Sequence, residues 1–242
     1  MEFEDKIVIV TGAASGIGES CARKLLDLNA TVAGLDRQPS KIVAQKFKTY
    51  LVDVTDVDAV RAAVDKVEKD SGKIDGLINC AGVTSNAKPF YEMSVEEFET
   101  VVSINLTGTF ICSKYVSRKM MMKKKGKVVN ISCIRSRIFG SNSADYSASK
   151  GGVVALTSAM AVDLAPFNIQ VNSVAPGATL TGMTRDRFSS PDVIAMYKKS
   201  IPLGRIAEAN DIAEVVLFLL SESANYVTGE TIFVDGGYSI SK

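Results

Sequence analysis

Tyr146 and Lys150 are the residues of this sequence whose types and spacing best fit proton-transfer chemistry. Residues four apart share one face of a helix, so the Lys150 ammonium can lie close to the Tyr146 phenol. An unperturbed tyrosine has a pKa of about 10, too high for an efficient base near neutral pH, and a nearby cation stabilises its anion. The pair therefore predicts a tyrosine that accepts a proton from an alcohol or donates one to a ketone.

A glycine-rich turn is the second chemical feature. Gly12, Gly16 and Gly18 lie in the segment TGAASGIG, between a short apolar run and a helical pattern. Glycines let a backbone approach a pyrophosphate closely, and the N-terminus of the following helix offers free N–H groups and a partial positive charge. The turn, which includes Ser15 and Ile17, predicts a dinucleotide site.

Acidic residues at two strand ends bear on the choice of cofactor. Asp36 ends the second expected strand, where such folds place a carboxylate on the ribose hydroxyls. It would repel a 2′-phosphate, whereas Arg37 beside it could bind one. We favour NAD over NADP. Asp53 follows the third expected strand and could contact adenine, although an aspartate there is also a common turn residue.

The elements that must position these residues are strands alternating with helices. Seven runs rich in β-branched residues predict strands at 6–11, 30–36, 49–52, 74–79, 127–132, 170–174 and 231–234. Apolar residues at helical spacing, such as Val57, Val60 and Val64, fill the segments between them. Strands separated by helices imply a parallel sheet with right-handed crossovers.

The alternation continues to the end of the sequence without a linker or an internal repeat. We therefore expect one α/β domain spanning residues 1–242. The least regular segment, 179–204, contains Gly182, Pro191 and Pro202 around a short helical pattern. Long irregular inserts often serve as lids or binding loops, so we expect a substrate loop there.

Composition argues against several classes of protein. The 28 Lys and Arg residues balance 27 Asp and Glu residues, so no basic excess suggests a nucleic acid or an anionic membrane as partner. Histidine is absent and the four cysteines form no CxxC pair, which argues against a metal site. The first residues lack the features of a signal peptide or a membrane span. We expect a cytoplasmic protein with reduced thiols.

Three further motifs appear in order along the chain. They are NCAG at 79–82, Asn105 within a helix, and YSASK at 146–150. With the glycine-rich turn and VDGG at 234–237, they resemble the short-chain dehydrogenase/reductase family over essentially the whole sequence. The resemblance implies a doubly wound, Rossmann-type fold with a seven-stranded parallel sheet, assembled as a homotetramer or homodimer. It also implies NAD(P)-dependent interconversion of a secondary alcohol and a ketone.

The same resemblance assigns site residues at the strand ends. For the cofactor these are Asn79, Ala81 and Gly82 on the adenosine-ribose side, Pro176, Gly177, Thr179 and Thr181 at the nicotinamide, and also Asp53, Val54, Tyr146 and Lys150. Asn105 would support a proton-relay water through its helix.

One position departs from the family pattern. A serine that binds the substrate oxygen usually lies about thirteen positions before the tyrosine, and here that position is Cys133. A thiol is a weaker donor than a hydroxyl. Ser132 is adjacent, but strand neighbours point to opposite faces, so we favour Cys133 as the occupant. Ser136 and Ser143 are more remote alternatives.

Two functions of different class follow from these observations. Asn105, Tyr146 and Lys150 together predict an enzyme acting on a small alcohol or ketone: a polyol, a sugar acid or a 3-oxoacyl compound. Cys133 leaves open a catalytically weakened dinucleotide-binding regulator or scaffold. Arg135 follows the site strand closely and could face a polar or anionic substrate.

Overall fold

The computed structural model describes residues 3–241, and across them seven parallel strands form one sheet in the order β3-β2-β1-β4-β5-β6-β9. The strands are β1 (Ile7–Thr11), β2 (Thr31–Asp36), β3 (Phe47–Leu51), β4 (Gly76–Asn79), β5 (Gly126–Ile131), β6 (Ile169–Pro176) and β9 (Thr231–Val234). Each corresponds to a predicted strand, so the doubly wound, seven-stranded fold is confirmed. The strand order reverses between β1 and β4, and ligands of such folds bind at that switch point.

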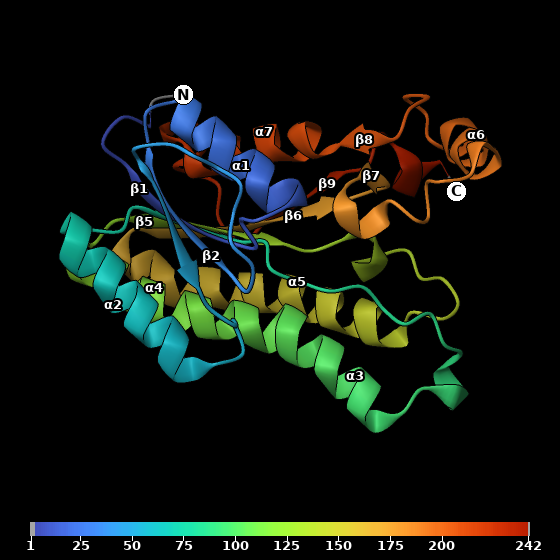
Figure 1. Cartoon of the computed structure of the whole chain (residues 1–242), viewed down its shortest axis with the longest axis horizontal. Helices are drawn as coiled ribbons and strands as arrows, with labels where there is room; N and C mark the ends of the chain where they lie inside the picture. Colours follow the sequence, from blue (N-terminus) through green and yellow to red (C-terminus); the bar gives the residue numbers. More distant parts are fainter. Residues whose placement is uncertain (1–2, 242) are drawn as a thin grey trace.

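Helices cover both faces of the sheet (Figure 1). One layer contains α1 (Gly16–Asp27) and α7 (Ala209–Leu220), and the other contains α2 (Val57–Ser71), α4 (Gly108–Lys123) and α5 (Ala144–Leu164). The shorter α3 packs against α5 and spans Val95–Val102. The two helical layers leave the carboxyl ends of the strands accessible, and side chains from several elements meet at that edge of the sheet.

Strand β1 shows why the sheet needs two helical layers. Val8 and Val10 belong to the hydrophobic cluster that includes side chains of α1 and α7. Ile7 and Ile9 belong to the cluster that includes side chains of α2 and α4. None of the four is more than 8% exposed. A strand that is buried on both faces reads as a continuous apolar run, which is the pattern seen in the sequence.

Segment 179–204 forms a small layer of its own. Its strand β7 (Thr179–Leu180) pairs with β8 (Ala207–Glu208), and its helix α6 (Pro191–Ser200) lies beside the C-terminus in Figure 1. Phe188 is buried in a separate hydrophobic cluster and meets the Tyr197 ring edge-on at 5.3 Å between centroids. The two-residue strands were not predicted, because so short a pairing leaves no periodic signal.

The four cysteines are free thiols. Cys21 and Cys112 are buried in the two main clusters. Cys80 packs against the core but remains partly exposed, because it lies where β4 ends and the chain enters the loop beside the glycine-rich turn. Within residues 3–241, no helix is both long and apolar enough to cross a membrane.

Candidate active site

The glycine-rich turn joins β1 to α1, and two of its glycines are required by contacts within the protein. A Cβ at Gly12, where φ is +68°, would lie 2.8 Å from the backbone nitrogen of Ala81. A Cβ at Gly18 would collide with the backbone oxygen of Gly12. Gly16 differs, because its φ is +58° and the nearest atom to a Cβ there is in the Thr181 side chain at 3.4 Å. Gly16 is therefore the glycine that leaves room for a ligand.

The start of α1 fits a pyrophosphate. Ser15 precedes the helix, and its exposed side chain makes no capping hydrogen bond to the first turn. The Thr11 hydroxyl accepts the N–H groups of Cys80 and Ala81, both at 3.0 Å, and so fixes the turn against the end of β4. Free N–H groups at a helix N-terminus beside a glycine backbone form an anion-binding site.

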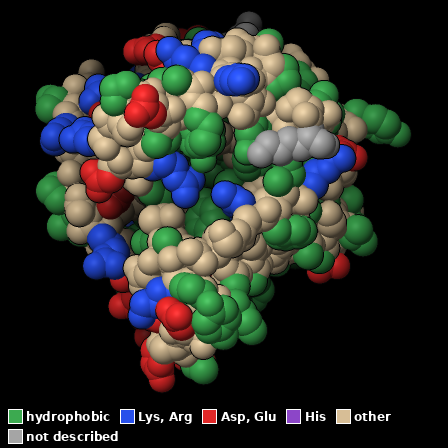
Figure 2. Space-filling view, turned by 90° about the vertical axis from the view of Figure 1, so that its right-hand side faces the viewer, with side chains coloured by type: hydrophobic (Ala, Val, Ile, Leu, Met, Phe, Trp, Pro, Cys, Tyr) green, Lys and Arg blue, Asp and Glu red, His purple; other side chains and the backbone are tan. Residues whose placement is uncertain are grey.

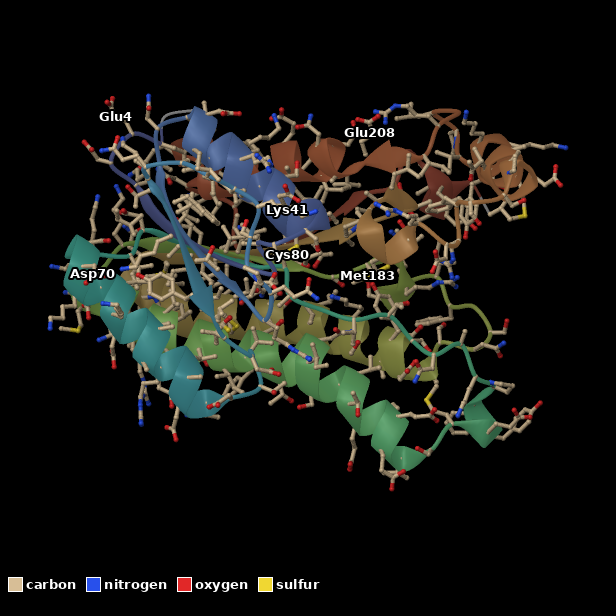
Figure 3. The ribbon with its side chains drawn as sticks, in the orientation of Figure 1. Glu4, Lys41, Asp70, Cys80, Met183 and Glu208 are labelled. Carbon is tan, nitrogen blue, oxygen red and sulfur yellow. The ribbon has the colours of Figure 1, made fainter. Side chains whose placement is uncertain are left out.

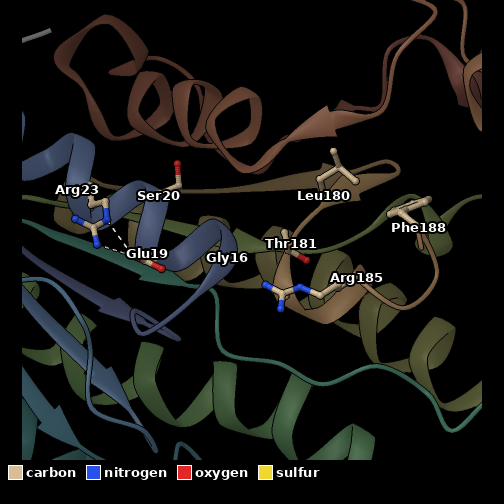
Figure 4. A pocket seen from close by; sticks show the side chains of 9 residues that line it. Gly16, Glu19, Ser20, Arg23, Leu180, Thr181, Arg185 and Phe188 are labelled. Carbon is tan, nitrogen blue, oxygen red and sulfur yellow. Dashed lines mark hydrogen bonds and ion pairs between the residues drawn. The ribbon is translucent and has the colours of Figure 1, made fainter. Parts of the chain in front are cut away.

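A pocket of about 570 Å³ opens beside this turn (Figure 4). It lies between α1 and the start of segment 179–204, and its lining includes Gly16, Thr181 and Arg185. The insert therefore forms the wall opposite the glycine-rich turn, which is where a lid over a bound ligand would be needed.

Asp36 is tied to the same turn. One carboxylate oxygen accepts the N–H of Ala14 at 2.9 Å, and the other accepts the N–H of Gln38 at 2.9 Å. This negative charge therefore lies beside the glycine-rich turn at the end of β2. Such a position suits the hydroxyls of a ribose and disfavours a phosphate on them.

Arg37 and Asp53 lie next to each other near Asp36. The Nε atom of Arg37 is 3.7 Å from a carboxylate oxygen of Asp53, and the Arg37 side chain is 68% exposed. The other Asp53 oxygen accepts the N–H and hydroxyl of Thr55, and these bonds, aided by Arg37, lower the pKa of Asp53. Asp53 thus has the turn role that was one of its two predicted alternatives.

Two residues that were predicted to bind the cofactor, Asn79 and Val54, have side chains that point away from the carboxyl ends of the strands. The Asn79 side chain is buried, and its Nδ2 donates to Ser113 and to Asn130 at 2.8 Å each. Val54 is buried so closely against α4 that a Cβ at Gly108 would lie 2.6 Å from it. The Asn79 side chain joins β4 to α4 and β5, and the Val54 side chain, in the turn after β3, packs against α4. The structure does not bring them to the ligand cleft.

The residues expected at the nicotinamide follow β6. Gly177 is pressed against Asp235, because a Cβ there would lie 2.8 Å from the Asp235 Cα atom. The buried Thr179 hydroxyl donates to the Gly177 carbonyl at 3.1 Å. Thr181 lies next to Gly16. The turn after Pro176 therefore runs beside the glycine-rich turn, as the cofactor assignment requires.

Lys150 and Asn105 are buried beside the end of β4. The Lys150 Nζ atom donates to the Ile131 carbonyl at 2.8 Å and lies 5.8 Å from the centroid of the Tyr146 ring. The Asn105 amide accepts the N–H of Val83 at 2.8 Å and donates to the Ser149 hydroxyl at 3.1 Å. Asn105 lies in a π-helical turn, a distortion often found at functional sites.

The structure separates the candidates for the serine position. The buried Ser132 hydroxyl donates to the Lys150 carbonyl at 2.9 Å, on the side of the strand that packs against α5. Cys133 is partly exposed and close enough to the Tyr146 phenol to affect its pKa. Ser136 and Ser143 donate to the carbonyls of Cys133 and Gly140. Cys133 is the candidate that adjoins the tyrosine.

The electrostatics of Tyr146 differ from the prediction. Burial raises its pKa well above the ordinary value, and the neighbouring Cys133 thiol adds to the rise. The cation that opposes the rise is Arg187, from segment 179–204, and not Lys150. Lys150 is itself buried, which lowers its pKa, and its ammonium points to a backbone carbonyl. No spacing in the sequence relates Arg187 to Tyr146, so the sequence offered no signal for it.

Comparisons with known proteins find relatives over nearly the whole chain. The family model described as enoyl-(acyl carrier protein) reductase matches residues 12–239. The 3-oxoacyl-[acyl-carrier-protein] reductase FabG of Aquifex aeolicus is 36% identical over 247 residues, which cover 98% of this chain and 98% of that protein. The cis-4-hydroxycyclohexanecarboxylate dehydrogenase of Sinomonas cyclohexanicum is 36% identical over 98% of both chains. Among solved structures, the aldohexose dehydrogenase of Thermoplasma acidophilum has a TM-score of 0.93 and 33% identity, over 98% of this chain and 95% of its own.

Proposed function

Because this chain belongs to the short-chain dehydrogenase/reductase family, whose members are NAD(P)-dependent oxidoreductases acting on CH–OH groups, we propose that it interconverts a secondary alcohol and a ketone with Tyr146 as general acid and base. The observation that carries the proposal is the position of Tyr146, beside Cys133 and Lys150. We propose that residues 1–242 act as one unit, with segment 179–204 as its substrate loop.

The chain's own residues supply the proton chemistry. When bound, the nicotinamide supplies or receives the hydride. In reduction, the half-buried Tyr146 phenol donates its proton to the carbonyl oxygen, and its raised pKa keeps that proton available at neutral pH. In oxidation, the phenolate accepts the proton of the alcohol. Positioned proton transfer of this kind contributes on the order of 10²–10⁴ in rate.

Three further residues support Tyr146 in this proposal. Lys150 is the proposed helper of Tyr146, because its ammonium lies 5.8 Å from the centroid of the Tyr146 ring while it donates to the Ile131 carbonyl. Cys133 takes the place of the family's serine and donates its S–H to the substrate oxygen, more weakly than a hydroxyl would. Asn105, in its π-helical turn, supports the water that exchanges protons with the site.

We propose NAD as the preferred cofactor. Asp36 brings a carboxylate to the end of β2 beside the glycine-rich turn, where it accepts ribose hydroxyls and repels a 2′-phosphate. Arg37 faces Asp53, so part of its charge is already compensated. The expected homotetramer or homodimer and the cytoplasmic location remain predictions.

One of the substrate classes predicted from the sequence, the 3-oxoacyl compounds, also appears in the name of a relative. The compared proteins are named for a 3-oxoacyl-[acyl-carrier-protein], an aldohexose and a cis-4-hydroxycyclohexanecarboxylate. All three names describe a molecule that carries a carbonyl or an alcohol together with a further polar group. A catalytically weakened regulator remains the second candidate, favoured only by the thiol of Cys133 in place of a serine.

The test is turnover of purified protein with NAD and NADP against alcohols, sugar acids and ketones, followed by cofactor absorbance. Tyr146→Phe is the control, and its cofactor binding should be unchanged. Turnover that disappears in Tyr146→Phe supports the enzyme, and unchanged turnover in that variant contradicts the mechanism. If cofactor binds without turnover, recovery of activity in Cys133→Ser would support the weakened regulator.

A further inference from the structure

The pocket beside the glycine-rich turn has one wall from α1 and one from segment 179–204 (Figure 4). Gly16 belongs to the first wall, and Thr181 and Arg185 belong to the second. Tyr146 and Cys133, which adjoin the proposed position of the substrate oxygen, are not among the described residues that line it. The pocket therefore lies at the phosphate-binding turn rather than at the site of proton transfer.

The glycine-rich turn supplies no cation for a pyrophosphate, although each phosphate of that group carries a negative charge. Residues 11–18 contain no lysine or arginine, and the carboxylate of Asp36 is bonded to the same turn. The N-terminus of α1 contributes a partial positive charge of roughly half an elementary charge. The remaining positive charge must come from a side chain of another element.

Two arginines line the pocket, and one of them is already paired. Arg23 donates to Glu19 from Nε at 2.9 Å and from an Nη atom at 2.6 Å, so the charges of this pair compensate each other. Arg185 is exposed, and its guanidinium has no ion pair or hydrogen bond within residues 3–241. Figure 4 shows the Arg185 side chain extending from the insert toward the start of α1. Arg185 is therefore the uncompensated cation of this pocket.

Hydrogen bonds hold the backbone that carries Arg185. This residue follows the one-turn helix Gly182–Thr184, on which the Met183 side chain is exposed (Figure 3). The Thr184 hydroxyl accepts the N–H of Thr181 at 3.0 Å and donates to a carbonyl of β7 at 2.6 Å. An arginine on an anchored backbone loses less freedom on binding than one on a loose loop.

We propose that Arg185 binds the pyrophosphate of the dinucleotide from the side opposite the N-terminus of α1. The planar guanidinium can donate two parallel hydrogen bonds to the oxygens of a phosphate. Figure 2 looks onto the side of the molecule that carries segment 179–204 and shows Lys and Arg side chains around a hollow, a field that attracts an anionic ligand. The inference rests on the proposed function, because the ligand is the cofactor of that reaction. It makes the insert part of the cofactor site as well as the proposed substrate loop.

The test separates the pyrophosphate from the rest of the cofactor, and it measures binding without turnover. Calorimetry gives the dissociation constants of ADP-ribose, which contains the pyrophosphate, and of adenosine, which does not. Arg185→Gln should weaken ADP-ribose binding by about tenfold, because hydrogen bonds between two charged groups are lost, and should leave adenosine binding unchanged. NAD and NADP should weaken by the same factor, since both contain the pyrophosphate.

Two further variants and the salt dependence complete the comparison. Arg185→Lys should keep part of the affinity, because an ammonium retains the charge without the planar fork. Lys199→Gln is the matched control, since it removes one exposed positive charge from α6 of the same insert and should leave ADP-ribose binding unchanged. Between about 0.05 and 0.5 M salt, the affinity for ADP-ribose should fall more steeply in wild type than in Arg185→Gln. Thermal unfolding checks that each variant is folded.

The outcomes distinguish this inference from the proposed function. Unchanged ADP-ribose binding in Arg185→Gln overturns the inference, and Tyr146-dependent turnover beside that result leaves the enzyme intact. Equal losses for adenosine and ADP-ribose, or a larger loss for NADP than for NAD, also overturn it, because Arg185 would then act away from the pyrophosphate. Arg185-dependent binding of ADP-ribose without turnover supports the inference and contradicts the enzyme. If wild-type protein binds no dinucleotide, both proposals are wrong.

Discussion

In the proposed mechanism Cys133 has two effects, one on the substrate oxygen and one on Tyr146. Its thiol is a weak donor to the substrate oxygen. It also raises the pKa of the phenol, beyond the effect of burial. A raised pKa leaves less phenolate at a given pH, so alcohol oxidation should speed up as the pH rises toward 10 and above, while ketone reduction should be favoured at lower pH.

Cys133→Ser should therefore raise kcat/KM for alcohol oxidation several-fold and move the rising limb of its pH profile to lower pH. Initial rates between pH 6 and about 10 would measure both effects. Cys133→Ala separates them, because it removes the thiol without adding a hydroxyl and should shift the profile without the gain in rate. Unchanged profiles in both variants would show that Cys133 does not act on Tyr146.

Asp36 should decide the cofactor by its charge. Asp36→Asn removes the charge and keeps an oxygen that can accept the Ala14 N–H, whereas Asp36→Ala removes both. Each variant should strengthen NADP binding relative to NAD by about tenfold, because one like-charge repulsion near a surface costs on the order of 1 kcal/mol. Fluorescence titration with both cofactors measures the ratio, and a ratio equal to wild type would exclude Asp36 as the discriminator.

At the residue scale, the local geometry around Tyr146 was predictable from the sequence, but its electrostatics were not. The spacing of Tyr146 and Lys150 and the alternation of Ser132 and Cys133 depend only on local helix and strand geometry, which periodicity reveals. Arg187 acts on Tyr146 from a distant part of the chain. Likewise, the Asn79 side chain faces α4 because of how β4 and β5 pack. Such contacts depend on tertiary packing.

At the scale of elements, α7 depends on Asp211. Its carboxylate accepts the N–H of Glu208 at 2.8 Å, completing the helix cap, and also binds the Arg205 guanidinium at 2.6 and 2.7 Å. These interactions lower the pKa of Asp211 to about 2. Because α7 covers one face of the sheet, its cap contributes to the stability of the whole fold.

Asp211→Ala should lower the free energy of unfolding by about 1 kcal/mol at pH 7, the usual cost of a lost cap. Because the pKa of Asp211 is lower in the folded than in the unfolded protein, its carboxylate stabilises the fold at pH values above about 3.9, the pKa in the unfolded chain. That contribution is lost as the pH falls toward 2. The difference between wild type and variant in urea unfolding should therefore be constant from pH 7 to 5 and shrink below about 4. A constant difference at all pH values would mean that the carboxylate charge does not matter.

The seven main strands were predictable because each is buried and continuous. The short strands β7 and β8 were not, since their pairing depends on how segment 179–204 folds back onto the sheet. That segment is only partly packed: Phe188 is buried, whereas Met183 and Met196 remain more than half exposed. Its role as a binding loop was inferred from irregularity alone, which says nothing about which side chains face the site.

The whole molecule leaves an apolar helical face uncovered. On α5, Ala155, Ala159 and Val162 are exposed at helical spacing, and the Val162 side chain is 75% exposed. On the neighbouring α4, Phe110 is 46% exposed. Both helices also pack against the sheet, so they have apolar residues on two faces. Small residues on an outer face allow a second helix to approach closely.

We expect this face to pair with the same face of a second copy, since isologous contacts are the commonest way in which identical chains associate. Val162→Glu should lower the sedimentation coefficient, because a dimer contact would have to bury an unpaired carboxylate. The subunit itself should stay folded, since the side chain of residue 162 is exposed. Val43→Glu is the matched control, because that side chain is 98% exposed in a loop after β2. If Val162→Glu sediments like wild type, α5 is not at the interface, and if wild type sediments as a single chain, the expected assembly is wrong.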